Sequence, residues 1–229
     1  MKSHCLIMLS VAVWLVSSVT ATAQQLAGLG EYAAVTKIQG GFQFVEGPAQ
    51  TPDGSVYFTD IPANAIHRLT PDGKIEVFIE PSAHANGLMY GGQDRLLACQ
   101  MDGQLVSIDL TSKKTTTLAD KYQGKRFNAC NDLVIDKLGG IYFTDPRYNA
   151  PDPWPQVKEA FYYRSADGKV IRLGDNLTAP NGIGLSPDEK TLYVIPSMSS
   201  EMMAPPKAQL AGVSGTAMMP SSSPAGEKT

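Results

Sequence analysis

The stretch "GSVYFTD" at residues 54–60 returns almost unchanged as "GGIYFTD" at residues 139–145. Two weaker copies complete the series, "DRLLACQ" at 94–100 and "KTLYVIP" at 190–196. The central residues of the four copies are separated by 40, 45 and 51 positions; they are Tyr57, Leu97, Tyr142 and Tyr193. Each copy follows a turn signal and is rich in β-prone residues, so the chain reads as an internal repeat of short strands.

Further short strands separated by turn residues lie between the copies, for example "GQLVSIDLTSKKTTTLA" at 103–119. A unit of about 40–45 residues with about four strands is typical of one β-propeller blade. A β-sandwich is the competing all-β architecture, but it does not require a fixed repeat. The longest interval contains residues 146–160, an insert with four Pro and one Trp, which we expect to form a loop over one face.

Composition excludes several classes of protein. The 229 residues include 19 basic and 22 acidic side chains, so there is no basic excess for nucleic acid. The 21 Gly and 16 Pro argue against long helical bundles. Three Cys are too few for a disulfide scaffold or a thiolate zinc cluster. Of these, Cys99 and Cys130 either pair in an oxidising compartment or remain as buried free thiols.

The N-terminus has the pattern of a secretory signal. A short basic start precedes the apolar run "CLIMLSVAVWLV" at 5–16, and Ala21-Thr22-Ala23 is an A-x-A cleavage site. We expect a signal peptide at 1–23, cleavage before Gln24, and a secreted or periplasmic protein without membrane attachment. The alternative is an uncleaved anchor.

The repeat also places polar residues in one register. Eleven residues before the central position of the first three copies, and twelve before that of the fourth, stand Glu46, Asn86, Asn131 and Asn181. In a propeller the innermost strand of each blade borders the axis, so equivalent positions converge on one point. One Glu and several Asn form an all-oxygen cluster, which suits hard cations.

Each of these residues also has a structural interpretation. Asn-Gly is the commonest hairpin turn pair, which explains Asn86 and Asn181 taken singly. Asn131-Asp132 fits an ordinary Asx turn. The shared register of all four residues favours a site.

Four segments resemble one family: "FVEGP" followed by "DGSVYFTD", then "HANGL", "GKRFNACNDLVID" with "YFTDPRY", and "APNGIGLSPDEKTLYV". They are similar to the gluconolactonase / senescence marker protein / luciferin-regenerating family over about residues 40–194. The resemblance implies a six-bladed propeller holding one divalent cation, with calcium first and magnesium, manganese or zinc as alternatives. It also implies hydrolysis of small sugar lactones or related esters.

Site residues are carried over from the matching motifs. The resemblance implies that Glu46, Asn131 and Asn181 are metal ligands and that Asn86 and His84 lie on the substrate side. Asn128 would lie near the pocket. The cation would polarise a lactone carbonyl and lower the pKa of a bound water. The usual serine-hydrolase signature G-x-S-x-G is absent from the sequence.

The chain departs from the family pattern at its C-terminal end. The resemblance implies a fifth-blade Asp as the last metal ligand and general base, but no Asp follows Asp188, so the catalytic residue is unknown. We expect four segments along the chain. A signal peptide at 1–23 is followed by a lead-in at 24–39 and by a partial propeller at 40–194, with about three blades plus the start of a fourth. The last segment is a disordered, possibly frameshifted tail at 195–229.

Two functions follow from these observations. One is a divalent-metal-dependent lactone hydrolase that is impaired in this chain. The alternative is a non-catalytic propeller fragment that serves as a binding surface or as a non-functional gene product.

Overall fold

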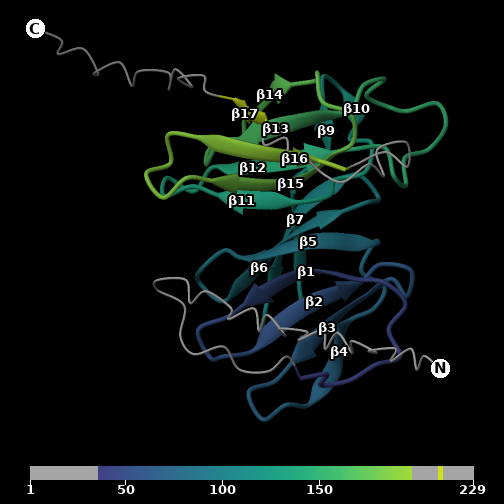
Figure 1. Cartoon of the computed structure of the whole chain (residues 1–229), viewed down its shortest axis with the longest axis vertical. Coiled ribbons are helices and arrows are strands. Elements are labelled where there is room, and N and C mark those ends of the chain that lie inside the picture. The colour runs from purple at the N-terminus through teal and green to yellow at the C-terminus, as the bar shows by residue number, and fades with distance from the viewer. Residues whose placement is uncertain (1–35, 198–210, 214–229) are drawn as a thin grey trace, which may run out of the picture. The chain divides into compact units, whose positions relative to one another are not determined.

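The computed structural model describes residues 36–197 and 211–213 (Figure 1). The expected signal peptide, most of the lead-in and most of the expected disordered tail lie outside the described residues. The chain divides into two compact units, Met1–Ile38 and Gln39–Thr229, and all described strands belong to the second. None of the described residues forms a helix able to cross a membrane.

Three four-stranded antiparallel sheets follow one another along the described chain, each with its strands in sequence order. The first contains β1 (Val45–Gln50), β2 (Val56–Asp60), β3 (Ala65–Leu69) and β4 (Ile75–Ile79). The second contains β5 (Ala85–Tyr90), β6 (Arg95–Gln100), β7 (Gln104–Asp109) and β8 (Thr115–Ala119). The third contains β11 (Leu133–Ile135), β12 (Ile141–Asp145), β13 (Ala160–Arg164) and β14 (Val170–Gly174).

A fourth, three-stranded sheet contains β15 (Pro180–Leu185), β16 (Leu192–Pro196) and β17 (Ala211–Val213). A small two-stranded ribbon, β9 (Lys121–Tyr122) with β10 (Lys125–Arg126), precedes the third sheet. The first strands of successive sheets contact one another in the order β1, β5, β11, β15. This is the arrangement of propeller blades, and the predicted β-propeller of three blades plus the start of a fourth is confirmed.

Strand β17 differs from the sequence expectation, which placed no strand after β16. It pairs antiparallel with β16, with Ala211 opposite Val194 and Val213 opposite Leu192. The pairing uses main-chain groups on the open edge of β16, so it needs no hydrophobic periodicity of its own. That is why the sequence pattern did not indicate it.

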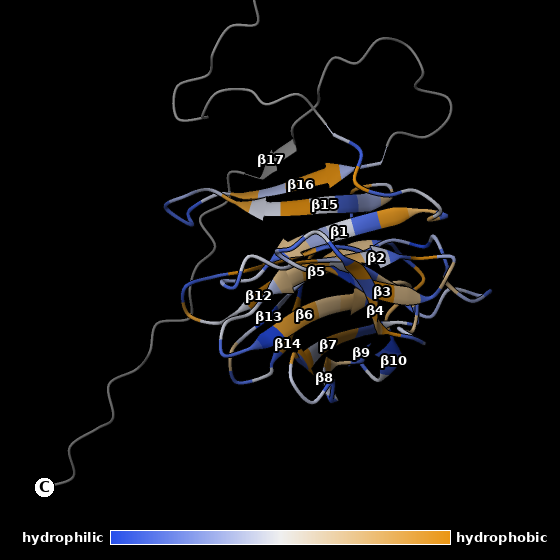
Figure 2. Ribbon diagram, turned by 90° about the horizontal axis from the view of Figure 1, so that it is seen from below, coloured by the Kyte–Doolittle hydropathy of each residue, from blue (hydrophilic) through white to orange (hydrophobic). Residues whose placement is uncertain are grey.

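Strand β6 shows why the repeat packs into blades. Its alternating side chains point to opposite faces of the sheet. Leu96 and Ala98 join a buried cluster with residues of the first blade, whereas Leu97 and Cys99 join a cluster with residues of the third. Hydrophobic residues therefore run along the strands while the connecting loops are more polar (Figure 2). The second blade is therefore held to both of its neighbours by burial of apolar side chains.

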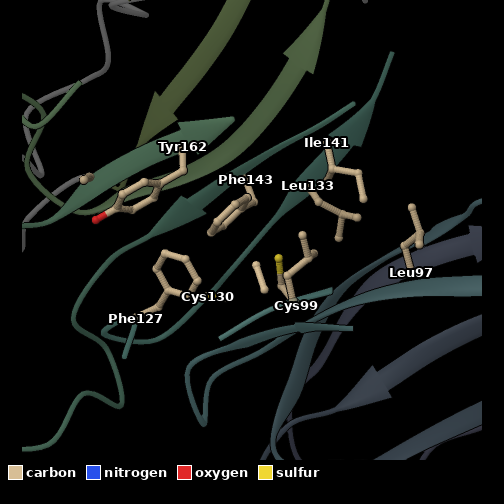
Figure 3. Packing of buried hydrophobic residues seen from close by; sticks show 11 residues of the cluster. Leu97, Cys99, Phe127, Cys130, Leu133, Ile141, Phe143 and Tyr162 are labelled. Carbon is tan, nitrogen blue, oxygen red and sulfur yellow. The ribbon is translucent and has the colours of Figure 1, made fainter. Parts of the chain in front are cut away.

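The core between the second and third blades contains Cys99 and Cys130 (Figure 3). Cys99 and Cys130 are fully buried free thiols, and burial raises the pKa of each well above its usual value. Around them pack Phe127, Phe143 and Tyr162, whose rings lie within 5.0–5.4 Å of one another. The structure therefore matches the expectation of buried free thiols.

Polar contacts join the blades near their first strands. The Thr59 hydroxyl donates to the carbonyl of Asn86 at 3.1 Å, and the Thr144 hydroxyl donates to the carbonyl of Asn181 at 2.7 Å. Cys99 stands at the equivalent position of the second blade and directs its thiol to the carbonyl of Asp132 at 3.5 Å. The Thr of the repeated "YFTD" motif thus ties its blade to the next one.

We predict that Thr144→Val lowers the free energy of unfolding by about 1–3 kcal/mol, because a hydrogen-bonded hydroxyl is replaced by a methyl of similar size. The matched control is Thr116→Val on the exposed outer strand β8, which should change it by no more than about 0.5 kcal/mol. Urea denaturation measures both. Equal effects of the two substitutions would contradict the role given to Thr144.

Candidate functional site

The first strands of the first and third blades are each approached through a loop held by a buried carboxylate. Asp60 accepts the main-chain N–H groups of Gln43 and Phe44 at 2.9 and 3.0 Å. Asp145, at the same position of the third repeat, accepts those of Asn128 and Ala129 at 2.9 and 2.8 Å. The final Asp of "YFTD" therefore fixes the segment that ends at Glu46 in one blade and at Asn131 in the other.

The two carboxylates differ in their pKa. Burial raises the pKa of Asp145 to about 7, and its main-chain hydrogen bonds only partly oppose this. Burial acts in the same direction on Asp60, but the N–H groups of Phe44 and Gln43 outweigh it and lower the pKa. Folding thus disfavours the ionised form of Asp145. The contribution of this carboxyl group to the free energy of unfolding therefore falls as the pH rises from about 4 towards 7.

A β-bulge occurs at three of the four positions that the shared register predicted to converge. Pairing shifts between Glu46 and Ala49 in β1, between Ala85 and Leu88 in β5, and between Pro180 and Gly182 in β15. A bulge re-aims side chains and is common beside active sites. Asn86 and Asn181 therefore lie within bulged strands, and the alternative that they form hairpin turns is wrong.

Two glycines allow the first strands to approach closely. A Cβ on Gly47 would lie 2.2 Å from the carbonyl oxygen of Asn86, and one on Gly87 would lie 2.7 Å from that of Asn131. The N–H of Gly87 donates to that same Asn131 oxygen at 2.7 Å. The Gly that follows Glu or Asn in "VEGP" and "ANGL" is thus required by contact with the next blade.

The bulged strands surround a cavity of about 310 Å³. The four residues predicted from the shared register all line it: Glu46, Asn86, Asn131 and Asn181. Of these, Asn86 and Asn131 are buried, whereas Glu46 is exposed. The structure therefore brings together side chains from four blades, as the register argument requires.

Asp132 also lines this cavity, and the sequence reasoning did not include it as a site residue. Its two carboxylate oxygens accept the N–H groups of Leu133 at 2.9 Å and Ile183 at 3.1 Å. Burial raises its pKa, and the charge of Glu46 acts in the same direction. Its position directly after Asn131 was the available signal, but an Asx turn explained that pair equally well.

The other two predicted site residues lie outside the cavity lining. The amide of fully buried Asn128 is used on both sides, since it donates to Lys158 O at 2.8 Å and accepts from Gln156 N–H at 3.0 Å. Asn128 therefore joins the loop before β11 to the insert at residues 146–160. His84 is half-buried, and its Nδ1 lies 3.0 Å from a carboxylate oxygen of Asp102.

The donor set of the cavity fits a hard cation. Its polar side chains are the carboxylates of Glu46 and Asp132 and the amides of three asparagines. No thiolate or imidazole is among them, and no cluster of three or more His, Cys, Asp or Glu occurs within the described part of the chain. Oxygen donors of this kind suit calcium or magnesium better than a softer metal.

Comparisons with known proteins show which family the chain is similar to. Residues 44–219 match the protein family described as the SMP-30/gluconolactonase/LRE-like region. A gluconolactonase of Zymomonas mobilis is 34% identical over 172 residues, which are 66% of this chain and 48% of that protein. The lactonohydrolase oryL of Aspergillus oryzae is 37% identical over 118 residues, which are 48% of this chain and 27% of that protein.

Among solved structures, a gluconolactonase of Xanthomonas campestris superposes with a TM-score of 0.65 at 29% sequence identity. The alignment covers 68% of this chain and 55% of that one. The chain thus spans about half the length, or less, of the curated relatives described above.

We predict that Gly87→Ala destabilises the protein by about 1–3 kcal/mol, because the new methyl group meets main-chain atoms of the next blade. The matched control is Gly184→Ala in β15, where an added Cβ meets nothing within 4 Å and the backbone is not left-handed. That substitution should be neutral or slightly stabilising. Thermal and urea unfolding compare the two variants, and equal stability would show that the blades do not approach as described.

Proposed function

Because the chain belongs to the SMP-30/gluconolactonase/LRE-like family, we propose that its cavity is part of the site of a divalent-metal-dependent sugar lactone hydrolase. The observation that carries the proposal is the convergence of Glu46, Asn131 and Asn181 on one cavity from three different blades. The named activities of the Zymomonas and Aspergillus relatives support a lactone as the substrate.

In this proposal Glu46, Asn131 and Asn181 hold the cation, with calcium first and magnesium, manganese or zinc as alternatives. A bound cation supplies a Lewis acid for a carbonyl oxygen and lowers the pKa of a water. Glu46 brings the negative charge to the ligand set, and the amides add neutral oxygens. The charge of the ligands sets the affinity of such sites, so binding to this chain is proposed to be weak.

The substrate side of the cavity would be formed by Asn86, which lines it, with His84 directly before the same strand. Amide groups both donate and accept hydrogen bonds, as binding of a neutral polyhydroxy compound requires. Asp132 lines the same cavity, and each of its oxygens accepts one main-chain N–H and keeps a further lone pair.

One observation favours the second candidate, a non-catalytic propeller fragment acting as a binding surface or without function. Residues 189–229 contain no Asp, whereas the family resemblance implies an aspartate as general base. A small molecule is the proposed ligand both of the hydrolase and of the non-catalytic binding surface. Export to the periplasm or the exterior is part of the proposal and depends on the signal pattern at residues 1–23.

The test is calorimetric titration of the full chain with calcium, alongside gluconolactone hydrolysis. We expect a dissociation constant in the weak range of about 10⁻⁴–10⁻³ M, as in low-affinity calcium sites, and slow hydrolysis. Glu46→Gln should weaken binding at least tenfold and remove the hydrolysis, because the charged ligand is lost.

The matched control is Glu76→Gln on β4 of the same blade, where the carboxylate lies near Arg68 and Lys74. It should leave both measurements unchanged. Binding without hydrolysis would favour the non-catalytic candidate. Calcium binding that is indifferent to Glu46→Gln would show that the ion is held elsewhere.

A further inference from the structure

We propose that Tyr148, from the insert between β12 and β13, is a positioning residue that orients the amide of Asn181 for cation binding. This inference rests on the proposed function, because it takes Asn181 as a ligand. It concerns a residue that neither the shared register nor the family motifs assigned to the site.

The amide nitrogen of Asn181 is held by two hydroxyl groups. Its Nδ2 donates to the phenol oxygen of Tyr148 at 3.3 Å and to Oγ of Ser197 at 3.0 Å. The Tyr148 hydroxyl has one proton of its own and lies within hydrogen-bonding distance of Ser197 Oγ. Both protons of the amide nitrogen therefore have acceptors, and each hydroxyl oxygen accepts one of them.

This network fixes which end of the amide is left for a ligand. With Nδ2 turned to the two hydroxyls, the carbonyl Oδ1 is the end without these partners. The main chain of Asn181 is held as well, because its carbonyl accepts from the Thr144 hydroxyl at 2.7 Å. An amide that is free to rotate also presents its NH₂ end towards a cation, whereas a fixed one presents oxygen.

The insert is attached firmly enough to hold Tyr148 there. The buried carboxylate of Glu159 accepts the N–H of Arg147 at 3.1 Å and that of Ala179 at 2.9 Å. It thereby joins the start of the insert to the residue two positions before Asn181. The Arg147 guanidinium also covers the Trp154 ring at 4.6 Å from its centroid.

The experiment uses Tb³⁺, a luminescent stand-in for Ca²⁺, titrated into the full chain. Removal of the phenol oxygen in Tyr148→Phe should weaken Tb³⁺ binding about 10-fold or more, as loss of an outer hydrogen-bond partner does in other metal sites. Ca²⁺ competition should show the same ratio. The unfolding midpoint without metal should not change, because Tyr148 is exposed.

The matched control is Tyr163→Phe in the same blade. Its hydroxyl donates to Asp136 at 3.3 Å, at the end of β11 opposite Asn131, so Tb³⁺ affinity should be unchanged. Equal affinities of wild type and Tyr148→Phe would overturn the inference and leave the proposed function standing. A parallel loss in Tyr163→Phe would show a general structural effect and also overturn it. Failure of the wild-type chain to bind Tb³⁺ would overturn the inference and the proposed function together.

Discussion

The structure depends on how the first strand of each blade is tied to the blade before it. The carbonyl of Asn86 accepts the Thr59 hydroxyl, that of Asn181 accepts the Thr144 hydroxyl, and that of Asn131 accepts the Gly87 N–H. The residues that direct side chains into the cavity are therefore the same residues whose main chains join the blades. Site geometry and blade packing cannot vary independently, because one short segment serves both.

The same constraint explains the repeated motif. In "YFTD", the aromatic residues belong to the sheet, the Thr bonds to the following blade, and the Asp fixes the approach to its own first strand. Where the second copy has "LACQ", Cys99 and Gln100 replace the last two residues. Cys99 keeps a contact to the next blade, and Gln100 donates to Ser82 O at 3.0 Å on the approach to β5. The contacts persist although the residue types change.

Much of this could be predicted from the sequence. The interval between copies predicted the blades, and the shared register predicted that Glu46, Asn86, Asn131 and Asn181 would meet. The bulges could not be predicted, because they depend on pairing with the neighbouring strand, and an Asn-Gly pair in isolation favours a hairpin turn. The contacts of Asn128, Asp132 and Tyr148 were not predicted, for a related reason. Their roles depend on contacts across 28 to 51 residues, for which a single sequence contains no local pattern.

The central claim is that oxygen ligands from separate blades converge on one cation. A crystal structure of the full chain soaked with Tb³⁺, with the ion located by its anomalous scattering, tests it most directly. The account predicts one site in the cavity, with the Glu46 carboxylate and the Oδ1 atoms of Asn131 and Asn181 directed at the ion. An ion bound elsewhere, or a cavity in which the Asn181 Nδ2 faces the ion, would contradict it.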